Sequence, residues 1–101
     1  MKTRKEFDSI GGIKVPVDKY WGASTQRSKK FFNIGKILVP SSIIRSIAII
    51  KRSAAIVHRK DKLISAKVSG AIIKSSNEVI AGKLDDNFPL KVWQTGSGTQ
   101  T

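Results

Sequence analysis

The chain has 101 residues, 40% of them hydrophobic and 26% charged, which fits one small globular domain or a piece of a larger protein and excludes a disordered chain. It contains no cysteine and one histidine, so disulfides, cysteine–metal sites and multi-histidine metal sites are excluded. We expect a cytoplasmic protein, because no apolar run approaches the ~20 residues of a membrane span and no apolar core follows the basic N-terminus. The net charge is +12, but fourteen of the nineteen basic residues are scattered lysines, a distribution that does not favour nucleic-acid binding.

Residues 1–20 are rich in β-forming side chains and predict a short pair of strands. Gly11 and Gly12 are expected to form the tight turn between the two strands. Pro16 should end the second strand or confine it to an edge. After this pair, Ser24 or Thr25 can cap a short helix over residues 26–32, and a loop follows between Gly35 and Pro40.

Residues 41–60 carry the strongest periodic signal of the chain and predict an amphipathic helix. Its expected inward stripe is Ile43, Ile47, Ile50, Ala54 and Val57, widened by Ile44, Ala48 and Ala55. A second helix is predicted over residues 62–81, with Asp61 as its cap and Gly82 as its stop. Its expected inward residues are Ile64, Val68, Ile72 and Val79. The short joint between the two helices predicts that they pack antiparallel.

Few side chains outside the C-terminal segment suggest chemistry. Arg45, Arg52 and Arg59 are spaced by seven and share one helix face, which could bind phosphates, be solvated or contact another subunit. The adjacent Asp85 and Asp86 are typical of a solvated turn, and His58 of a surface or interface histidine. The aromatic residues Tyr20, Trp21, Phe31 and Phe32 are expected in a core or interface.

The C-terminal residues, from Pro89 onward, are expected to run extended through Trp93 and then to enter a loop of alternating glycines and hydroxyl side chains. In the segment 95–101, TGSGTQT, glycines free the backbone and four hydroxyls can donate hydrogen bonds to an anion. The composition therefore suits a carboxylate or a phosphate, although a flexible linker has the same composition. The segment is neither a P-loop nor a GxGxxG dinucleotide motif.

Four stretches of the chain together resemble one enzyme family. They are residues 15–28 (VPVDKYWGASTQRS), 43–45 (IIR), 77–84 (NEVIAGKL) and 88–101 (FPLKVWQTGSGTQT). In this order and spacing they are similar to the N-terminal portion of class II fumarate hydratase. Aspartate ammonia-lyase is the nearest relative within the wider superfamily. Its loop typically has alanine before Gly-Thr, whereas Ser97 stands there in this chain.

The resemblance implies a mainly α fold: the N-terminal lyase domain over residues 1–101, with a β-hairpin, an antiparallel helix pair and an extended segment. It also implies a lyase of the citric acid cycle that hydrates fumarate reversibly to (S)-malate. The family is a homotetramer that uses no metal and no organic cofactor. By the same resemblance Ser97, Gly98 and Thr99 bind a substrate carboxylate, and no residue of this chain is the catalytic base.

The resemblance has departures, and other functions stay open. Ser24 stands where the family usually has glutamine, and Ser75, Ser76 and Asn77 stand where Ala-Ala-Asp is typical. We expect residues 1–101 to be an N-terminal portion that is inactive by itself, because the family's base and water-activating histidine lie further along. The alternatives are a non-catalytic fragment, an aspartate ammonia-lyase-like relative, or a small basic nucleic-acid-binding protein.

Overall fold

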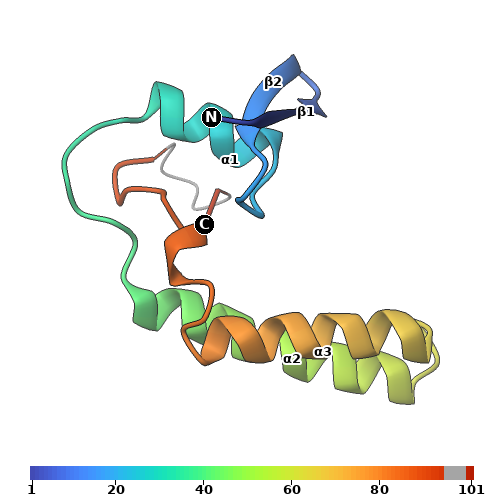
Figure 1. The fold of residues 1–101 in the computed structure, drawn as a ribbon. Helices are drawn as coiled ribbons and strands as arrows, with labels where there is room; N and C mark the ends of the chain where they lie inside the picture. Colours follow the sequence, from blue (N-terminus) through green and yellow to red (C-terminus); the bar gives the residue numbers. More distant parts are fainter. Residues whose placement is uncertain (95–99) are drawn as a thin grey trace. The chain divides into compact units, whose positions relative to one another are not determined.

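The structure is a computed structural model that describes residues 1–94 and 100–101 (Figure 1). Two strands come first, three α-helices follow, and a short 3₁₀ helix (Asp85–Asn87) comes last. The chain divides into two compact units. Unit 1 combines Met1–Val39 with Asp86–Thr101, and unit 2 is Pro40–Asp85. No helix in the described part of the chain is long and apolar enough to cross a membrane.

Unit 1 begins with a two-stranded antiparallel hairpin, β1 (Thr3–Asp8) and β2 (Gly11–Pro16). The predicted strand pair is confirmed, and β2 ends at Pro16 as expected. The prediction of a turn at Gly11 and Gly12 was wrong, because both residues pair in the ladder and the turn is Ser9–Ile10. Asp8 decides this register: its Oδ1 accepts the N–H groups of Ile10 at 3.0 Å and Gly11 at 3.2 Å.

Helix α1 (Ala23–Phe31) begins earlier than the sequence pattern predicted. Neither Ser24 nor Thr25 caps it. The N-cap is Gly22, which makes no side-chain cap bond, and the first turn closes where Gln26 N–H donates to the Gly22 carbonyl at 3.1 Å. Trp21 supports this start, because its indole Nε1 donates to Gln26 Oε1 at 2.8 Å. Helix α1 thus begins three residues before its predicted start and ends one residue before its predicted end.

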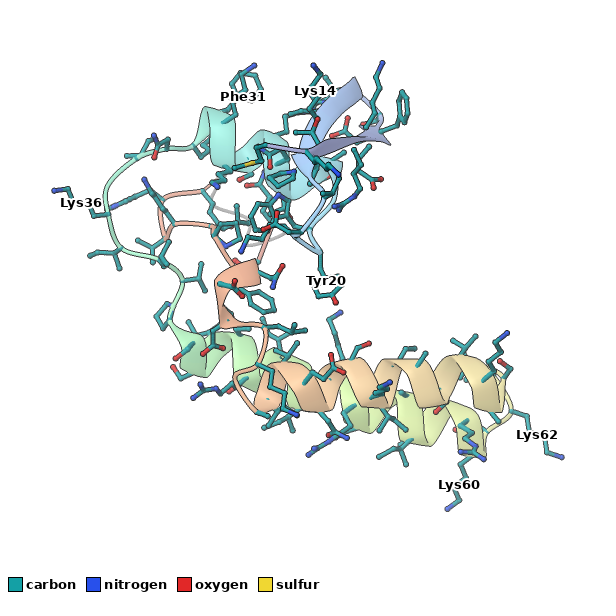
Figure 2. The ribbon with its side chains drawn as sticks, viewed as in Figure 1. Lys14, Tyr20, Phe31, Lys36, Lys60 and Lys62 are labelled. Atoms are coloured by element: carbon teal, nitrogen blue, oxygen red, sulfur yellow. The ribbon has the colours of Figure 1, made fainter. Side chains whose placement is uncertain are left out.

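The core of unit 1 is small and gathers side chains from distant parts of the sequence. Its buried apolar residues are Val15, Trp21, Ala23 and Leu90. Trp21 is therefore in the core as expected, whereas Tyr20 is 78% and Phe31 63% exposed. Figure 2 shows Phe31 pointing away from α1. Half-buried Phe32 is the fourth aromatic of the predicted group.

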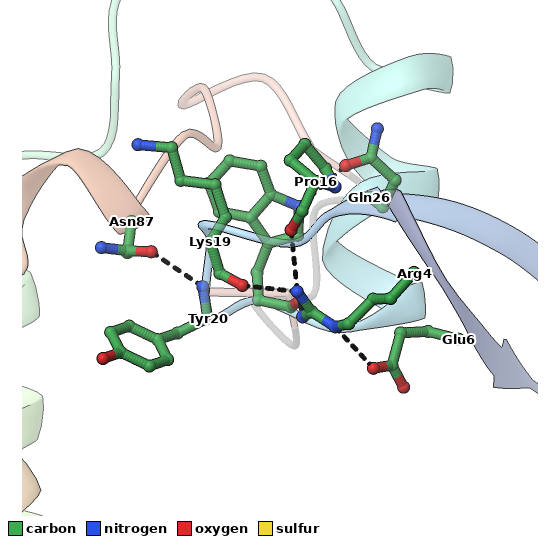
Figure 3. A network of polar contacts seen from close by, with 8 residues as sticks. Arg4, Glu6, Pro16, Lys19, Tyr20, Gln26 and Asn87 are labelled. Carbon is green, nitrogen blue, oxygen red and sulfur yellow. Dashed lines mark hydrogen bonds and ion pairs between the residues drawn. The ribbon is translucent and has the colours of Figure 1, made fainter. Parts of the chain in front are cut away.

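Arg4 ties the hairpin to the chain that follows it. Its Nη1 donates to the carbonyls of Pro16 and Lys19, and its Nη2 donates to the carbonyl of Trp21, each at 2.7 Å. Its Nε donates to Glu6 Oε1, also at 2.7 Å. Figure 3 shows this guanidinium among its partners. One side chain therefore donates to three backbone carbonyls, and the Pro16 carbonyl also accepts the Lys19 N–H at 3.3 Å.

The extended segment predicted from Pro89 to Trp93 is confirmed. It lies beside the predicted loop between Gly35 and Pro40, with an isolated antiparallel bridge between Leu38 and Lys91. Val39 N–H donates to the Leu90 carbonyl, and Val92 N–H donates to the Ile37 carbonyl, each at 3.0 Å. This pairing connects the two chain segments that form unit 1.

Unit 2 is a helical hairpin of α2 (Ser41–Lys60) and α3 (Ala66–Ile80), which lie side by side in Figure 1. The predicted bounds of α2 are confirmed. The predicted start of α3 was wrong, because Ser65 is its N-cap and accepts Val68 N–H at 3.1 Å. Asp61 instead ends α2, and Lys62 takes a left-handed φ of 59°. Gly82, with a φ of 80°, follows the end of α3 as predicted.

Small side chains, and not the large apolar ones, form the seam between α2 and α3. The buried residues are Ala48 and Ala55 on α2 and Ser69 and Ser76 on α3, each pair seven positions apart. The predicted inward stripe was partly wrong: Ile43, Ile50, Val57 and Val68 are 47%, 66%, 52% and 48% exposed, respectively. The predicted Ala48 and Ala55 are confirmed as buried. The other predicted inward residues are half-buried: Ile44, Ile47, Ala54, Ile64, Ile72 and Val79. Small residues occupy the buried positions of the seam because they let two helix backbones approach closely.

The arginine face of α2 serves the hairpin itself. Arg52 Nη1 donates to Asn77 Oδ1 at 2.8 Å, and Arg45 pairs with Asp85 at 3.5 Å. Two of the three arginines therefore have partners inside unit 2. Lys60 and Lys62 point outward at the joined end of the hairpin (Figure 2).

Candidate functional site

The three residues predicted to bind substrate, Ser97, Gly98 and Thr99, lie outside the described residues. The described residues on both sides of them are Gln94, Gln100 and Thr101, all in unit 1. Their contacts show what the flanking chain is attached to.

The two flanks meet through a pair of side chains. Thr101 Oγ1 lies 3.1 Å from Gln94 Nε2 and 3.2 Å from Gln94 Oε1. The amide can donate to the hydroxyl while the hydroxyl donates to the amide oxygen. This pair is exposed, but it brings residues 94 and 101 together at the base of the intervening segment.

The second support is a hydrogen bond to α1. Ser28 Oγ donates to Gln100 Oε1 at 2.5 Å, across 72 residues of sequence. Ser28 is a buried polar residue, with only 3% of its surface exposed. A buried hydroxyl is stable only when it is hydrogen-bonded, and Gln100 supplies the acceptor. The bond fixes Gln100, the residue immediately after Thr99, to the helix.

Helix α1 is itself held to the hairpin by an ion pair. Arg27 Nε donates to Asp8 Oδ2 and Arg27 Nη2 to Asp8 Oδ1, each at 3.0 Å. The same Nη2 donates to the Gly11 carbonyl at 3.1 Å. The hydrogen bonds from Arg27, helped by the Ile10 and Gly11 N–H groups, lower the pKa of Asp8 below its ordinary value of 3.8, against the opposing effect of burial. Asp8 therefore stays ionised at neutral pH.

A second ion pair, together with a backbone bond, holds the segment leading toward the site. Lys19 Nζ lies 2.8 Å from Asp86 Oδ2, and Tyr20 N–H donates to Asn87 Oδ1 at 2.8 Å (Figure 3 shows the second contact). The hydrogen bond between Lys19 and Asp86 raises the pKa of the lysine and lowers that of the carboxyl. Asp85 and Asp86 are exposed, as expected for a solvated turn, and each also has a basic partner.

Two hollows in unit 1 adjoin Ser28. One, of about 180 Å³, is lined among others by Ser28, Asn33, Lys91, Trp93 and Gln94. Lys91 Nζ donates to Asn33 Oδ1 there. The other, of about 530 Å³, is lined among others by Asp8, Arg27, Ser28, Phe31 and Gln100. Ser28 lies between the two hollows because it lines both.

Trp93 closes tightly over the loop after α1. A Cβ at Gly35 would lie 3.2 Å from Trp93 Cδ1, and Gly35 has a φ of 74°. Only glycine takes this conformation without strain, so the approach of the indole depends on it. This contact helps to set the course of the chain just before Gln94.

Possible metal ligands are sparse in the described part of the chain. Across residues 1–94 and 100–101, no group of three or more His, Asp or Glu side chains could hold a metal ion. His58 is exposed in the last turn of α2, as expected for a surface histidine.

The family model described as "Lyase" matches residues 11–101. The match includes α1, both helices of unit 2 and the whole C-terminal segment. The chain belongs to this lyase family.

Within the lyase family, the chain is similar to the N-terminal portion of class II fumarate hydratases. It is 52% identical over 99 residues to fumarate hydratase class II 2 of Bradyrhizobium diazoefficiens, covering 98% of this chain and 21% of the relative. It is 48% identical over 101 residues to fumarate hydratase class II of Bacillus subtilis, covering 100% of this chain and 22% of the relative. The chain thus spans about a fifth of the length of these lyases.

Solved structures of lyases share the fold. A class II fumarase from Schistosoma mansoni superposes with a TM-score of 0.95 at 46% identity, covering 98% of this chain and 21% of that one. A fumarate lyase:delta crystallin from Brucella melitensis gives a TM-score of 0.92 at 30% identity, covering 98% and 22%. These likenesses confirm the predicted fold class, a hairpin followed by helices.

Sequence reasoning missed two residues on which the site depends. Arg4 and Ser28 carry no local signal for these roles, because Arg4 reaches carbonyls 12 to 17 positions away and Ser28 reaches Gln100 across 72 positions. In the sequence Ser28 is only the last residue of the resembling stretch 15–28. A serine on the inward face of a short helix, next to an arginine, was the available clue.

Proposed function

We propose that the chain is part of a class II fumarate hydratase, which adds water reversibly to fumarate to give (S)-malate. The identity of 52% across nearly the whole chain carries this proposal. The superposition on a class II fumarase at a TM-score of 0.95 supports it. Aspartate ammonia-lyase-like activity is less well supported, because the relatives reported above are named fumarate hydratases or fumarate lyases.

In this proposal Ser97, Gly98 and Thr99 bind one carboxylate of the substrate. The hydroxyls of Ser97 and Thr99 donate to the carboxylate oxygens, and Gly98 lets the backbone approach. These residues position the substrate and do not transfer the proton. The anchoring of Gln100 and Thr101, immediately after them, supports a role that needs fixed donors.

The proposed whole enzyme is a cytoplasmic homotetramer of the citric acid cycle, to which residues 1–101 contribute the N-terminal lyase domain. It needs no metal and no organic cofactor. The base and the water-activating histidine come from segments outside residues 1–101, so this polypeptide by itself would not hydrate fumarate. The only histidine here, His58, is exposed in the last turn of α2.

The test is a kinetic assay of the full-length protein that carries residues 1–101. We expect the wild type to consume fumarate and release (S)-malate without added metal. The double variant Ser97→Ala/Thr99→Ala should raise KM for fumarate strongly and lower kcat/KM. Ser75→Ala, at an exposed position of α3, is the matched control and should keep wild-type kinetics.

Each outcome bears on a separate part of the proposal. A wild type that releases ammonia from aspartate and does not hydrate fumarate would replace the proposed activity. A double variant with the kinetics of the wild type would remove Ser97 and Thr99 from the substrate site and leave the activity in place.

A further inference from the structure

We propose that Ser28 is a positioning residue for substrate binding, which acts by holding Gln100 at the end of the segment that contains Ser97 and Thr99. This inference rests on the proposed function, because it concerns the carboxylate site of that reaction. Ser28 touches no substrate in this proposal. Its hydroxyl acts only through Gln100.

The burial of Ser28 points to its hydroxyl as the functional group. The residue is 3% exposed, and an alanine there would fill almost the same space without a polar atom to satisfy. Burying a hydroxyl has a cost that a hydrogen bond offsets. The bond that Ser28 donates goes to Gln100 Oε1 at 2.5 Å.

The position of Ser28 on a fixed helix makes it a suitable anchor. Its neighbour Arg27 is bonded to both carboxylate oxygens of Asp8 and to the Gly11 carbonyl. Helix α1 therefore cannot shift along the hairpin without breaking an ion pair whose side chains are 16% and 14% exposed. A side chain on this helix is therefore held in place by the bonds between the helix and the hairpin.

Gln100 is better held than the other described flank. The contact between Ser28 and Gln100 is partly buried, whereas the contact between Gln94 and Thr101 is exposed. Water competes less for the partly buried bond, so it contributes more to holding the chain in place. Loss of this bond would free the residue next to Thr99, and misplaced donors bind a carboxylate less well.

The experiment measures fumarate hydration by the full-length protein and by its Ser28→Ala variant. We expect KM for fumarate to rise about tenfold, with kcat changed less than about twofold, because the bond is worth about as much as a typical buried hydrogen bond. The inhibition constant of a competitive dicarboxylate, succinate, should rise by a similar factor. Ser24→Ala is the matched control, an exposed serine on the same helix, and should keep the wild-type KM.

A double-mutant cycle separates positioning from general loosening. Gln100→Met removes the acceptor and should raise KM as Ser28→Ala does. If the two residues act through their bond, the double variant Ser28→Ala/Gln100→Met should be no worse than either single variant.

Three results would count against the inference. Equal KM values for Ser28→Ala and Ser24→Ala, with an active wild type, would overturn this inference and leave the proposed function in place. Additive effects of Ser28→Ala and Gln100→Met would show that the two residues act separately and would also overturn it. A wild type without hydratase activity would overturn the proposed function and this inference with it.

Discussion

Arg27 donates a 3.0 Å hydrogen bond to each carboxylate oxygen of Asp8, joining α1 to the last residue of β1. The two side chains are 16% and 14% exposed, so this ion pair is better shielded than the pair between Lys19 and Asp86, where the carboxylate is 71% exposed. Asp8 also sets the turn by accepting the N–H groups of Ile10 and Gly11. One carboxylate thus supports both the hairpin and the helix that carries Ser28.

We expect the stability of unit 1 to fall in acid because Asp8 becomes protonated. Hydrogen bonds from Arg27 lower the folded-state pKa of Asp8 below its ordinary value of 3.8. Its contribution to folding is therefore complete above about pH 3.8 and is lost as the pH falls through the folded pKa. Melting temperatures measured between pH 3 and pH 7 test this, and Asp8→Asn should reduce the fall in melting temperature at acid pH. Asp18→Asn, at an exposed position of the same unit, is the control and should leave that fall unchanged.

Replacement of Arg4 should destabilise the hairpin and the chain that follows it. Arg4→Ala leaves the carbonyls of Lys19 and Trp21 without a donor and leaves the Pro16 carbonyl with the Lys19 N–H alone, which should cost about 2–3 kcal/mol. Arg4→Lys should recover only part of this, because an ammonium lacks the planar fork of a guanidinium. Urea titrations give the free energies of unfolding, with Arg59→Lys on the exposed side of α2 as control. Full recovery in Arg4→Lys would show that charge alone matters.

The seam between α2 and α3 should tolerate only small side chains. Ser69 is fully buried, and its Oγ donates to the Ala55 carbonyl at 3.1 Å. Ser69→Ala should cost about 1 kcal/mol through loss of this bond. Ser69→Leu should cost about 3 kcal/mol or more, because it forces the backbones apart. Ser75→Leu, exposed on the same helix, should be nearly neutral. Amide hydrogen exchange in α3 measures all three, and an equal effect of both leucines would contradict close packing at the seam.

Two glycines of unit 2 should respond to alanine with opposite signs. A Cβ at Gly70 meets nothing within 4 Å, so Gly70→Ala should stabilise α3 by about 0.5–1 kcal/mol through higher helix propensity. Gly82 has a φ of 80°, and its Cβ would lie 3.3 Å from both Arg45 Nη2 and Asp85 Oδ2. Gly82→Ala should therefore destabilise by about 1–2 kcal/mol. Chemical denaturation of both variants measures the two changes in the free energy of unfolding. Stabilisation by Gly82→Ala would argue against the left-handed backbone conformation of Gly82 after α3.

The sequence by itself determined the elements whose signals are local. The periodic apolar pattern predicted the bounds of α2, and Gly82 predicted the end of α3, because helix continuation depends on neighbours three to four positions away. The strand pair and the extended segment before Gln94 were predicted for the same reason. The four resembling stretches likewise predicted the lyase family and the fold.

Only the tertiary structure decided which residues make the contacts that stabilise the fold. The apolar stripe on α2 showed that a face would be buried, but the close approach of two backbones selected Ala48 and Ala55 over Ile43 and Ile50. Ser65 instead of Asp61 became the cap of α3 because the chain needed five residues to reverse between the helices. Arg4 reaches backbone carbonyls 12 to 17 positions away, and Ser28 reaches Gln100 across 72 positions. Such contacts depend on where folding brings distant segments together, and no local pattern contains that information.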